Sequence, residues 1–433
     1  MNPSLPRRML SLLRAGFTAF YQKTGKSLAF WAWIALLNLL VQIVLRHSLL
    51  PGQFAIFNTL LACISLLTLP CFALHTALVY FRPREPRPER VAALHAARPE
   101  LLQNFTLLWM ILSVPLLLTG LRLLKLPPDA PLEALVIPYV LFALGSYLSL
   151  ALWEKKNGLV FWGWLLAAAA LARLVVVGGF APSYPWAATG LDAGLLAGLI
   201  ILTPLLRSTG SDFRWRKTGM LAVLRDRELL VFLAATFSVT LGLFLFTSGD
   251  RLIEQVWFGQ PRDNNMGYVN WDLFDGYQTA GLLARGLLWG TQPVLLLLFV
   301  GRLPLTSTPR AIRRLFWIYL ALLVVGALLL RLLAGPLGWL FGGNDPGTTS
   351  AFIPGFILAF IPMGLLQGIG IFALASRRYP ECFALGGSSL GYILLLYFQG
   401  RPELILSCIF VGGLVSLMFV LFIGIVRWGR LQP

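Results

Sequence analysis

The chain has 433 residues, of which 58% are apolar and only 12% charged, and its formal net charge is +17. Its mean hydropathy is +0.77. About a quarter of the residues are charged in a soluble globular protein, so the composition excludes that class, together with disordered and collagen-like chains. In so apolar a chain the excess of Lys and Arg indicates membrane topology, and we expect no nucleic-acid partner.

Apolar stretches of about 20 residues recur along the chain, each long enough for a helix to cross roughly 30 Å of hydrocarbon. They predict twelve spanning helices, at residues 27–45, 54–81, 101–124, 133–153, 157–178, 184–206, 228–247, 273–301, 315–334, 349–376, 382–398 and 403–426. The strands of a membrane barrel alternate in polarity, and these stretches do not. The sequence therefore predicts an all-α polytopic membrane protein.

The cationic residues set the predicted orientation. With the amino terminus in the cytoplasm, most of the 35 Lys and Arg fall in cytoplasmic segments. The opposite side holds Arg46, Arg122, Lys125, Arg251, Arg262, Arg331 and Arg401, and Arg173 and Arg285 lie within spans. This asymmetry predicts a multi-pass protein of the bacterial inner (plasma) membrane with both termini in the cytoplasm.

The most hydrophilic interior segment divides the chain into two similar halves. We expect an amphipathic cytoplasmic segment at 1–26, an N-lobe with six spans at 27–206, a basic cytoplasmic linker at 207–227, and a C-lobe with six spans at 228–433. The second span of each lobe is unusually long and contains a proline, Pro70 or Pro293. Two related lobes around a central cavity are typical of carriers that work by alternating access.

Span eight carries the most informative polar residues. Gln278, Arg285 and Gln292 are seven residues apart and project from nearly one face, because two helical turns cover about 7.2 residues. An arginine near the middle of the bilayer is costly, so it must face protein or a wet cavity. Two interpretations follow: Arg285 binds an anionic substrate group such as a phosphate, or it forms a structural ion pair, with Asp192 of span six as the candidate acid.

Polar residues of the first two spans are candidates for the opposite wall of the cavity. Asn38 and Gln42 are four residues apart and share a face of span one, and His75 lies in span two. We expect them to contact the substrate together with Arg285, Gln278 and Gln292. The alternative for each is a hydrogen bond between helices.

Acidic residues at the predicted outer ends of spans are the remaining candidates. Asp250 and Asp275, with Asp192, are expected to form structural or coupling ion pairs. We interpret residues 247–272 as a solvated loop with a short helix, and Asp250 and Glu254 within it not as a catalytic pair. The chain shows no metal-ligand spacing, P-loop or dinucleotide motif, so we expect no enzyme activity, metal or cofactor.

Three short patches resemble a known family. They are Arg46 with residues 50–57 after span one, residues 248–253 at the end of span seven, and residues 276–285 at the start of span eight. These patches resemble motifs of polysaccharide flippases of the multidrug/oligosaccharidyl-lipid/polysaccharide (MOP) exporter superfamily. The resemblance implies two six-helix bundles around a central, often cationic cavity lined by spans one, two, seven and eight, and transport of lipid-linked saccharides.

We therefore expect a flippase that moves an anionic lipid-linked oligosaccharide or polysaccharide precursor across the inner membrane. Two alternatives remain open: a multidrug or cation exporter of the same superfamily, and a non-transporting membrane subunit of an exopolysaccharide assembly machine. Besides membrane lipids, the expected partners are the lipid-linked saccharide and a cytoplasmic glycosyltransferase or other assembly proteins, which the basic loop 82–90 would dock.

Overall fold

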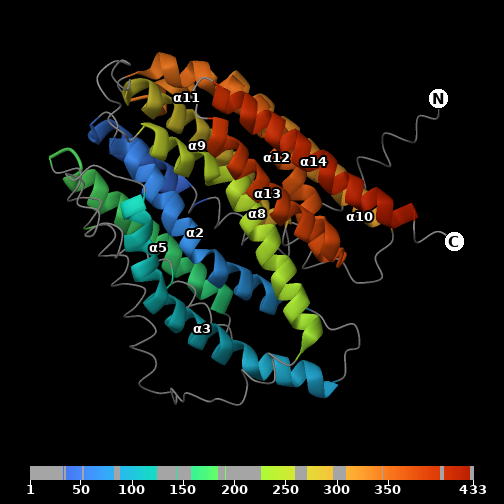
Figure 1. Ribbon diagram of the computed structural model, residues 1–433. Helices are drawn as coiled ribbons and strands as arrows, with labels where there is room; N and C mark the ends of the chain where they lie inside the picture. Colours follow the sequence, from blue (N-terminus) through green and yellow to red (C-terminus); the bar gives the residue numbers. More distant parts are fainter. Residues whose placement is uncertain are drawn as a thin grey trace, which may run out of the picture.

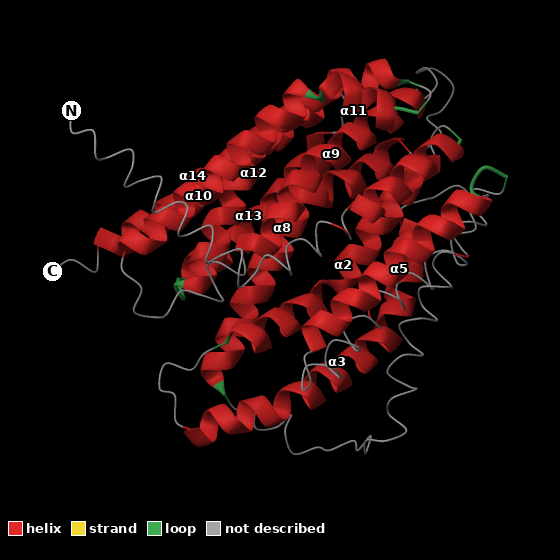
Figure 2. Cartoon of the chain, turned by 180° about the vertical axis from the view of Figure 1, so that it is seen from behind, coloured by secondary structure: helices red, strands yellow, loops and turns green. Residues whose placement is uncertain are grey.

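The computed structural model describes residues 33, 36–50, 53–81, 88–123, 144, 158–183, 191, 226–258, 271–295, 309–343, 345–399 and 404–429. Within these residues every regular element is a helix (Figures 1 and 2). The helices are Leu36–Ser48, α2 (Gln53–Tyr80), α3 (Pro88–Leu123), α5 (Gly158–Phe180), α8 (Arg227–Phe258), α9 (Trp271–Leu295), α10 (Pro309–Leu332), α11 (Ala334–Phe341), α12 (Pro346–Ala375), α13 (Tyr379–Gln399) and α14 (Ile405–Gly429).

The helices fall where hydropathy predicts spans. Every predicted span coincides with a helix except 133–153 and 184–206, which lie outside the described residues apart from Leu144 and Leu191. In the described part of the chain, six helices are long and apolar enough to cross a membrane, and a bent pair makes a seventh. The chain therefore folds as an all-α, multi-pass membrane protein.

Three helices differ from the prediction at their ends. α8 continues to Phe258, beyond the predicted end at 247, and α3 begins at Pro88, ahead of the predicted start at 101. The predicted span at 315–334 is α10, which bends by 69° at Leu333 into the short α11. Hydropathy detects only the part of a helix that lies in hydrocarbon, so it misses polar extensions and sharp bends.

Two clusters of buried apolar side chains form the core. The larger is formed by α8–α14 with Ala77 of α2, while the second is formed mainly by helix Leu36–Ser48, α2 and α5. Two smaller clusters contain residues of both α2 and α8. We call the described residues on either side of the linker 207–227 the N half and the C half. α2 and α8 lie side by side where these halves meet (Figure 1). Apart from Asp226 and Arg227, the linker lies outside the described residues, so the division into two lobes remains a prediction.

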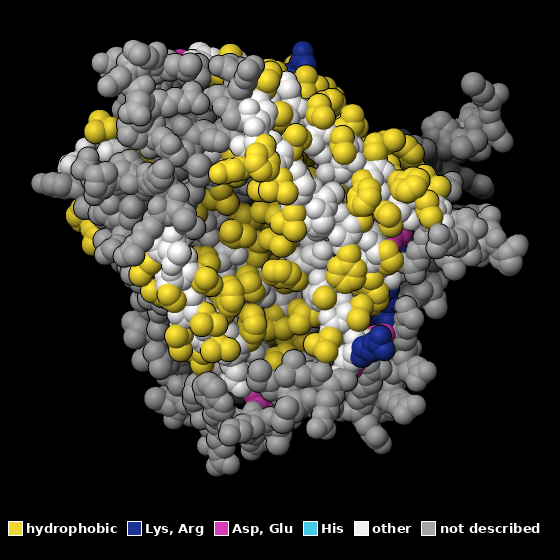
Figure 3. Space-filling view, viewed as in Figure 1, with side chains coloured by type: hydrophobic (Ala, Val, Ile, Leu, Met, Phe, Trp, Pro, Cys, Tyr) yellow, Lys and Arg dark blue, Asp and Glu magenta, His cyan; other side chains and the backbone are white. Residues whose placement is uncertain are grey.

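The described surface is strongly apolar. Large side chains such as Leu332, Phe398 and Ile425 are more than two-thirds exposed. Figure 3 shows hydrophobic side chains across the described part of one face, with the Lys, Arg, Asp and Glu side chains near its edges. Such a surface is stable against lipid tails and not against water, which agrees with a spanning bundle.

Candidate functional site: buried ion pairs at one end of the bundle

The last turns of α8 carry charged residues that the structure buries. Asp250, Arg251 and Glu254 are each at most 2% exposed. The prediction of a solvated loop from residue 247 is therefore wrong for 247–258, where the helix continues. The physical reason is pairing: charges on this face of α8 meet partners on α9, and a hydropathy average cannot detect such compensation.

Arg285 is enclosed by three helices of the C half. Its Nη2 donates to Asp250 Oδ2 of α8, and neither side chain is exposed. Its Cζ lies 5.6 Å from the ring centre of Phe356 and 5.4 Å from that of Phe360, both on α12. Gly281, one turn earlier on α9, makes room, since a Cβ there would lie 2.5 Å from Arg285 Nη1. The guanidinium is thus held by one carboxylate and two aromatic faces.

This geometry bears on the two interpretations of Arg285. The structure pairs it with Asp250, a different acid from the Asp192 expected from the sequence. Asp192 lies outside the described residues. In this conformation the guanidinium faces α8 and α12 and is closed to solvent, which favours the structural ion pair over an open anion site.

A second polar contact joins α8 to α9. Gln278 donates through Nε2 to Glu254 Oε2, and both side chains are buried. Glu254 follows Asp250 by one turn of α8, and Gln278 precedes Arg285 by two turns of α9, so the two contacts lie one after the other along an antiparallel helix pair. Gln292 belongs to α9, but its side chain lies outside the described residues.

A further ion pair connects the N half to the C half. Arg46, at the end of helix Leu36–Ser48, donates through Nη1 to Asp275 Oδ2 of α9 at 3.1 Å and through Nη2 to the Gly342 carbonyl at 3.0 Å. The other oxygen of Asp275 accepts the Ala55 backbone N–H of α2 at 3.0 Å. Arg46 is 2% exposed and Asp275 is fully buried. We call Arg46, Asp275, Gly342 and Ala55 the Arg46 clasp.

The polar residues expected on the opposite wall lie in the N half. Arg173 of α5 donates through Nη1 to Asn38 Oδ1 at 3.1 Å. Gln42, one turn further along the same helix, is partly buried, and its Oε1 has no hydrogen-bond partner among the described residues. His75 is partly buried on α2. Asn38 thus bonds within the N half, while Arg285 and Gln278 bond within the C half.

The buried charges at this end balance in sign. Arg46, Arg251 and Arg285 are accompanied by Asp250, Glu254 and Asp275, all of them almost fully buried. These six residues therefore leave no excess positive charge at this end that would favour an anion. Within the described residues, no three His, Cys, Asp or Glu side chains are grouped closely enough to hold a metal ion.

Sequence reasoning missed several members of this cluster. Arg46 was noted only as part of a motif, and Glu254 was assigned to a loop. The available signal was the complementary charge of residues at the predicted outer ends of spans one, seven and eight. An acid at the start of α9 and a base at the end of span one must meet if these ends lie together, because neither is stable alone in a buried place.

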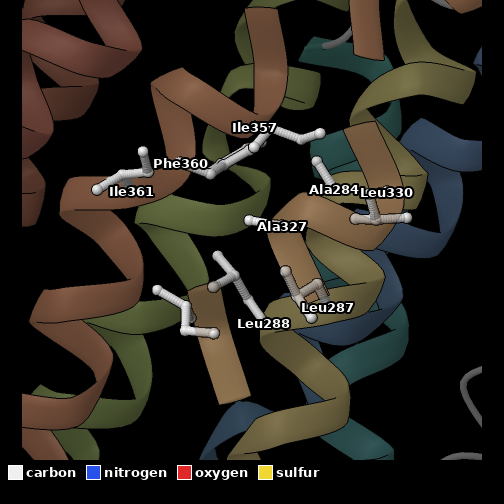
Figure 4. A pocket seen from close by; sticks show the side chains of 9 residues that line it. Ala284, Leu287, Leu288, Ala327, Leu330, Ile357, Phe360 and Ile361 are labelled. Carbon is white, nitrogen blue, oxygen red and sulfur yellow. The ribbon is translucent and has the colours of Figure 1, made fainter. Parts of the chain in front are cut away.

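An apolar pocket lies behind Arg285. Figure 4 shows side chains of α9, α10 and α12 that converge on it, among them Ala284, Ala327 and Ile361, and all its lining residues are apolar. Phe360 belongs to this lining and also contacts the Arg285 guanidinium. The lining offers no polar side chain to a ligand, so the pocket does not extend the charged site.

Asp345 caps α12 near the clasp. The hydroxyl and the backbone N–H of Thr348 both donate to its carboxylate, the latter at 3.0 Å. These hydrogen bonds lower the pKa of Asp345 below its ordinary value, and the charge of Arg46 acts in the same direction. The carboxylate therefore stays ionised and fixes the start of α12, beside the backbone that holds Arg46.

Together these features define a class: an all-helical membrane protein with buried ion pairs at one end of the bundle, one of which, Arg46–Asp275, joins its two halves. Two solved structures share its fold over nearly the full chain. A multidrug resistance MATE family transporter of the MOP superfamily, in an inward-facing conformation, has a TM-score of 0.58 at 11% identity and covers 92% of this chain and 94% of its own. A mutant form of the Vibrio cholerae MATE transporter VcmN has a TM-score of 0.55 at 13% identity, with 95% and 96% covered.

At these identities the likeness establishes the fold of MOP-superfamily transporters and nothing finer. No family model matches the chain, and no curated protein matches it. The sequence resemblance to the MOP superfamily is thus supported at the level of the fold, while its polysaccharide flippase branch is not.

Proposed function

We propose that this chain is a membrane transporter that works by alternating access, through relative movement of its two halves. The observation that carries the proposal is the full-length likeness to two MATE transporters, one of them described as inward-facing. The apolar outer surface supports it, as do the two main core clusters, one mostly in the C half and one mostly in the N half, because two units can rock only if each keeps much of its own core.

For the substrate we propose an anionic lipid-linked oligosaccharide. The three sequence patches that resemble polysaccharide flippases support this choice, and each of them contains a residue of the buried ion pairs. Arg285 is assigned a structural role in the C half, because its charge is neutralised by Asp250. Gln42 is the best candidate for a substrate contact, since its buried Oε1 lacks a hydrogen-bond partner in the described part of the chain.

A second candidate is a multidrug exporter. One solved neighbour is a multidrug resistance transporter, which favours it, and the balanced buried charge does not discriminate against cations. Under either proposal the protein binds no cofactor and acts within a bacterial inner membrane.

Reconstitution in proteoliposomes tests these proposals. Translocation of a fluorescent lipid-linked oligosaccharide is compared with efflux of a cationic dye. Faster saccharide movement than in empty liposomes supports the flippase, and dye efflux alone supports the exporter. If neither moves, transport is refuted and a non-transporting assembly subunit becomes the better explanation. Gln42→Ala should lower saccharide transport, while Leu40→Ala, at a 37% exposed position of the same helix, should not.

A further inference from the structure

The Arg46 clasp differs from the other buried ion pair in what it connects. The Arg285–Asp250 pair joins α8 to α9 within the C half. The clasp joins the end of helix Leu36–Ser48 and the start of α2, both in the N half, to α9 and the chain after α11 in the C half. Any movement that parts the halves at this end must break the clasp and can leave the other pair intact.

The contacts of the clasp are built on both sides. Arg46 uses two nitrogens for two acceptors in the C half, and Asp275 uses its second oxygen for the Ala55 backbone. A further hydrogen bond lies beside the clasp, where His47 Nε2 donates to the Leu340 carbonyl of α11 at 2.9 Å. The Phe54 ring, 5.5 Å from Arg46 Cζ, covers the guanidinium. Four hydrogen bonds donated by the N half thus fix it against the C half.

The backbone after α11 is shaped to receive Arg46. Gly343 has φ +59°, a conformation that favours glycine, and a Cβ there would lie 3.1 Å from Arg46 Cζ. The bend of 69° between α10 and α11 turns the chain back toward this end of the bundle, where Gly342 presents its carbonyl. The bend at Leu333 and the two glycines together place an acceptor and free space at the Arg46 side chain.

We infer that the Arg46 clasp is a gate, which holds the two halves together at the end that the predicted topology places outside and opens when they separate. The chemical groups that form the clasp are suited to a contact that breaks and forms again. A guanidinium, a carboxylate and backbone groups all exchange their protein partners for water once water enters, whereas an apolar seal has no such substitute. The inference rests on the proposed transport function for its purpose, but the opening itself can be measured without any substrate.

Alkylation of a single cysteine measures the opening. In a background in which Cys63, Cys71, Cys382 and Cys408 are replaced by serine or alanine, Ala55→Cys places a thiol at a position with no exposure in the closed clasp. The rate of its reaction with a polar maleimide is followed in detergent-purified, full-length protein. Leu50→Cys, at a 65% exposed position, controls for reagent activity, and Ala359→Cys, in the core of the C half, controls for unfolding.

Two variants open the gate in different ways. Arg46→Gln removes the charge, and Gly343→Ala keeps it but displaces the guanidinium and strains the backbone. Both should raise the alkylation rate of the Ala55→Cys thiol by about tenfold, with Ala359→Cys unchanged. The matched controls are Arg285→Gln, which breaks an ion pair inside the C half, and Gly335→Ala, where a Cβ meets open space. Neither should change the rate.

The outcomes separate this inference from the proposed function. If folded Arg46→Gln and Gly343→Ala proteins react at the wild-type rate, the clasp is no gate, even where transport is observed. If the rate rises in both while neither saccharide nor dye is moved, the gate stands and transport is refuted. An equal rise in the Arg285→Gln control would show general loosening and would overturn the inference. If the Arg46→Gln protein fails to fold, the Gly343→Ala variant decides the test, because it retains every charge.

Discussion

Replacing Asp250 with leucine tests the structural role assigned to Arg285. The change leaves a guanidinium with no exposed surface and no carboxylate partner. Removing one member of a buried ion pair costs about 3–5 kcal/mol, because the remaining charge keeps its desolvation penalty. The Phe356 and Phe360 rings do not offset this loss, since they contact the guanidinium before and after the change. For a unit the size of the C half, the loss lowers the melting temperature by roughly 10 °C.

The double variant Asp250→Leu/Arg285→Met supplies the control. It removes both charges and fills the site with apolar atoms, so stability should return to about the wild-type value or exceed it by up to about 4 kcal/mol. Thermal unfolding in detergent, followed by tryptophan fluorescence, gives the melting temperatures of the wild type, the single variant and the double variant. If Asp250→Leu alone melts at the wild-type temperature, Arg285 has another partner and the reasoning fails. If the double variant folds but no longer transports, Arg285 binds substrate after all.

The capping carboxylate and a helix contact give further predictions. Because hydrogen bonding holds the pKa of Asp345 below the unfolded value of about 3.9, its stabilisation is present above that pH and is lost as the pH falls through the folded pKa. Asp345→Asn, which keeps the cap, should therefore flatten the acid decline of melting temperature between about pH 5 and pH 2. A Cβ at Gly338 would lie 1.8 Å from Ser350 Oγ and 2.8 Å from the Pro346 carbonyl, so Gly338→Ala should cost about 1–3 kcal/mol. Gly335→Ala, with open space around it, should not destabilise the protein, and a comparison of the two melting temperatures checks both.

Hydropathy was sufficient to predict which segments form the helices of this fold, but not where each helix begins and ends. The long apolar helices α2, α12 and α14 follow the predicted spans to within a few residues, because lipid requires an apolar stretch of fixed length. The extension of α8 to Phe258 was missed, since Asp250, Arg251 and Glu254 read as a solvated loop. Their burial depends on partners in another helix, which a sequence average along one helix does not contain.

The candidate site was predicted in part, and the reason lies in how its residues pair. The sequence singled out Arg285 as a buried charge that needs compensation, and Asp250 and Asp275 as members of ion pairs. It could not assign partners, because Asp250 is 35 positions and Arg46 is 229 positions away from the side chain that each contacts. Only the packing of α8, α9 and helix Leu36–Ser48 against one another selects these pairs from the other combinations of opposite charge.

The two kinds of ion pair have different physical requirements. A pair within one half, such as Arg285 with Asp250, is stable only while water is excluded from both groups, and two aromatic rings and an apolar pocket lie around it. A pair between halves must separate if the halves move. The free-energy cost of that separation is then set by how well water replaces each contact. The clasp lies at an end of the bundle, beside the exposed residues His47 and Leu50, and two of its three hydrogen bonds use a backbone group. Solvent can therefore reach and satisfy it as it opens, which keeps the barrier to opening small compared with that of unpairing Arg285.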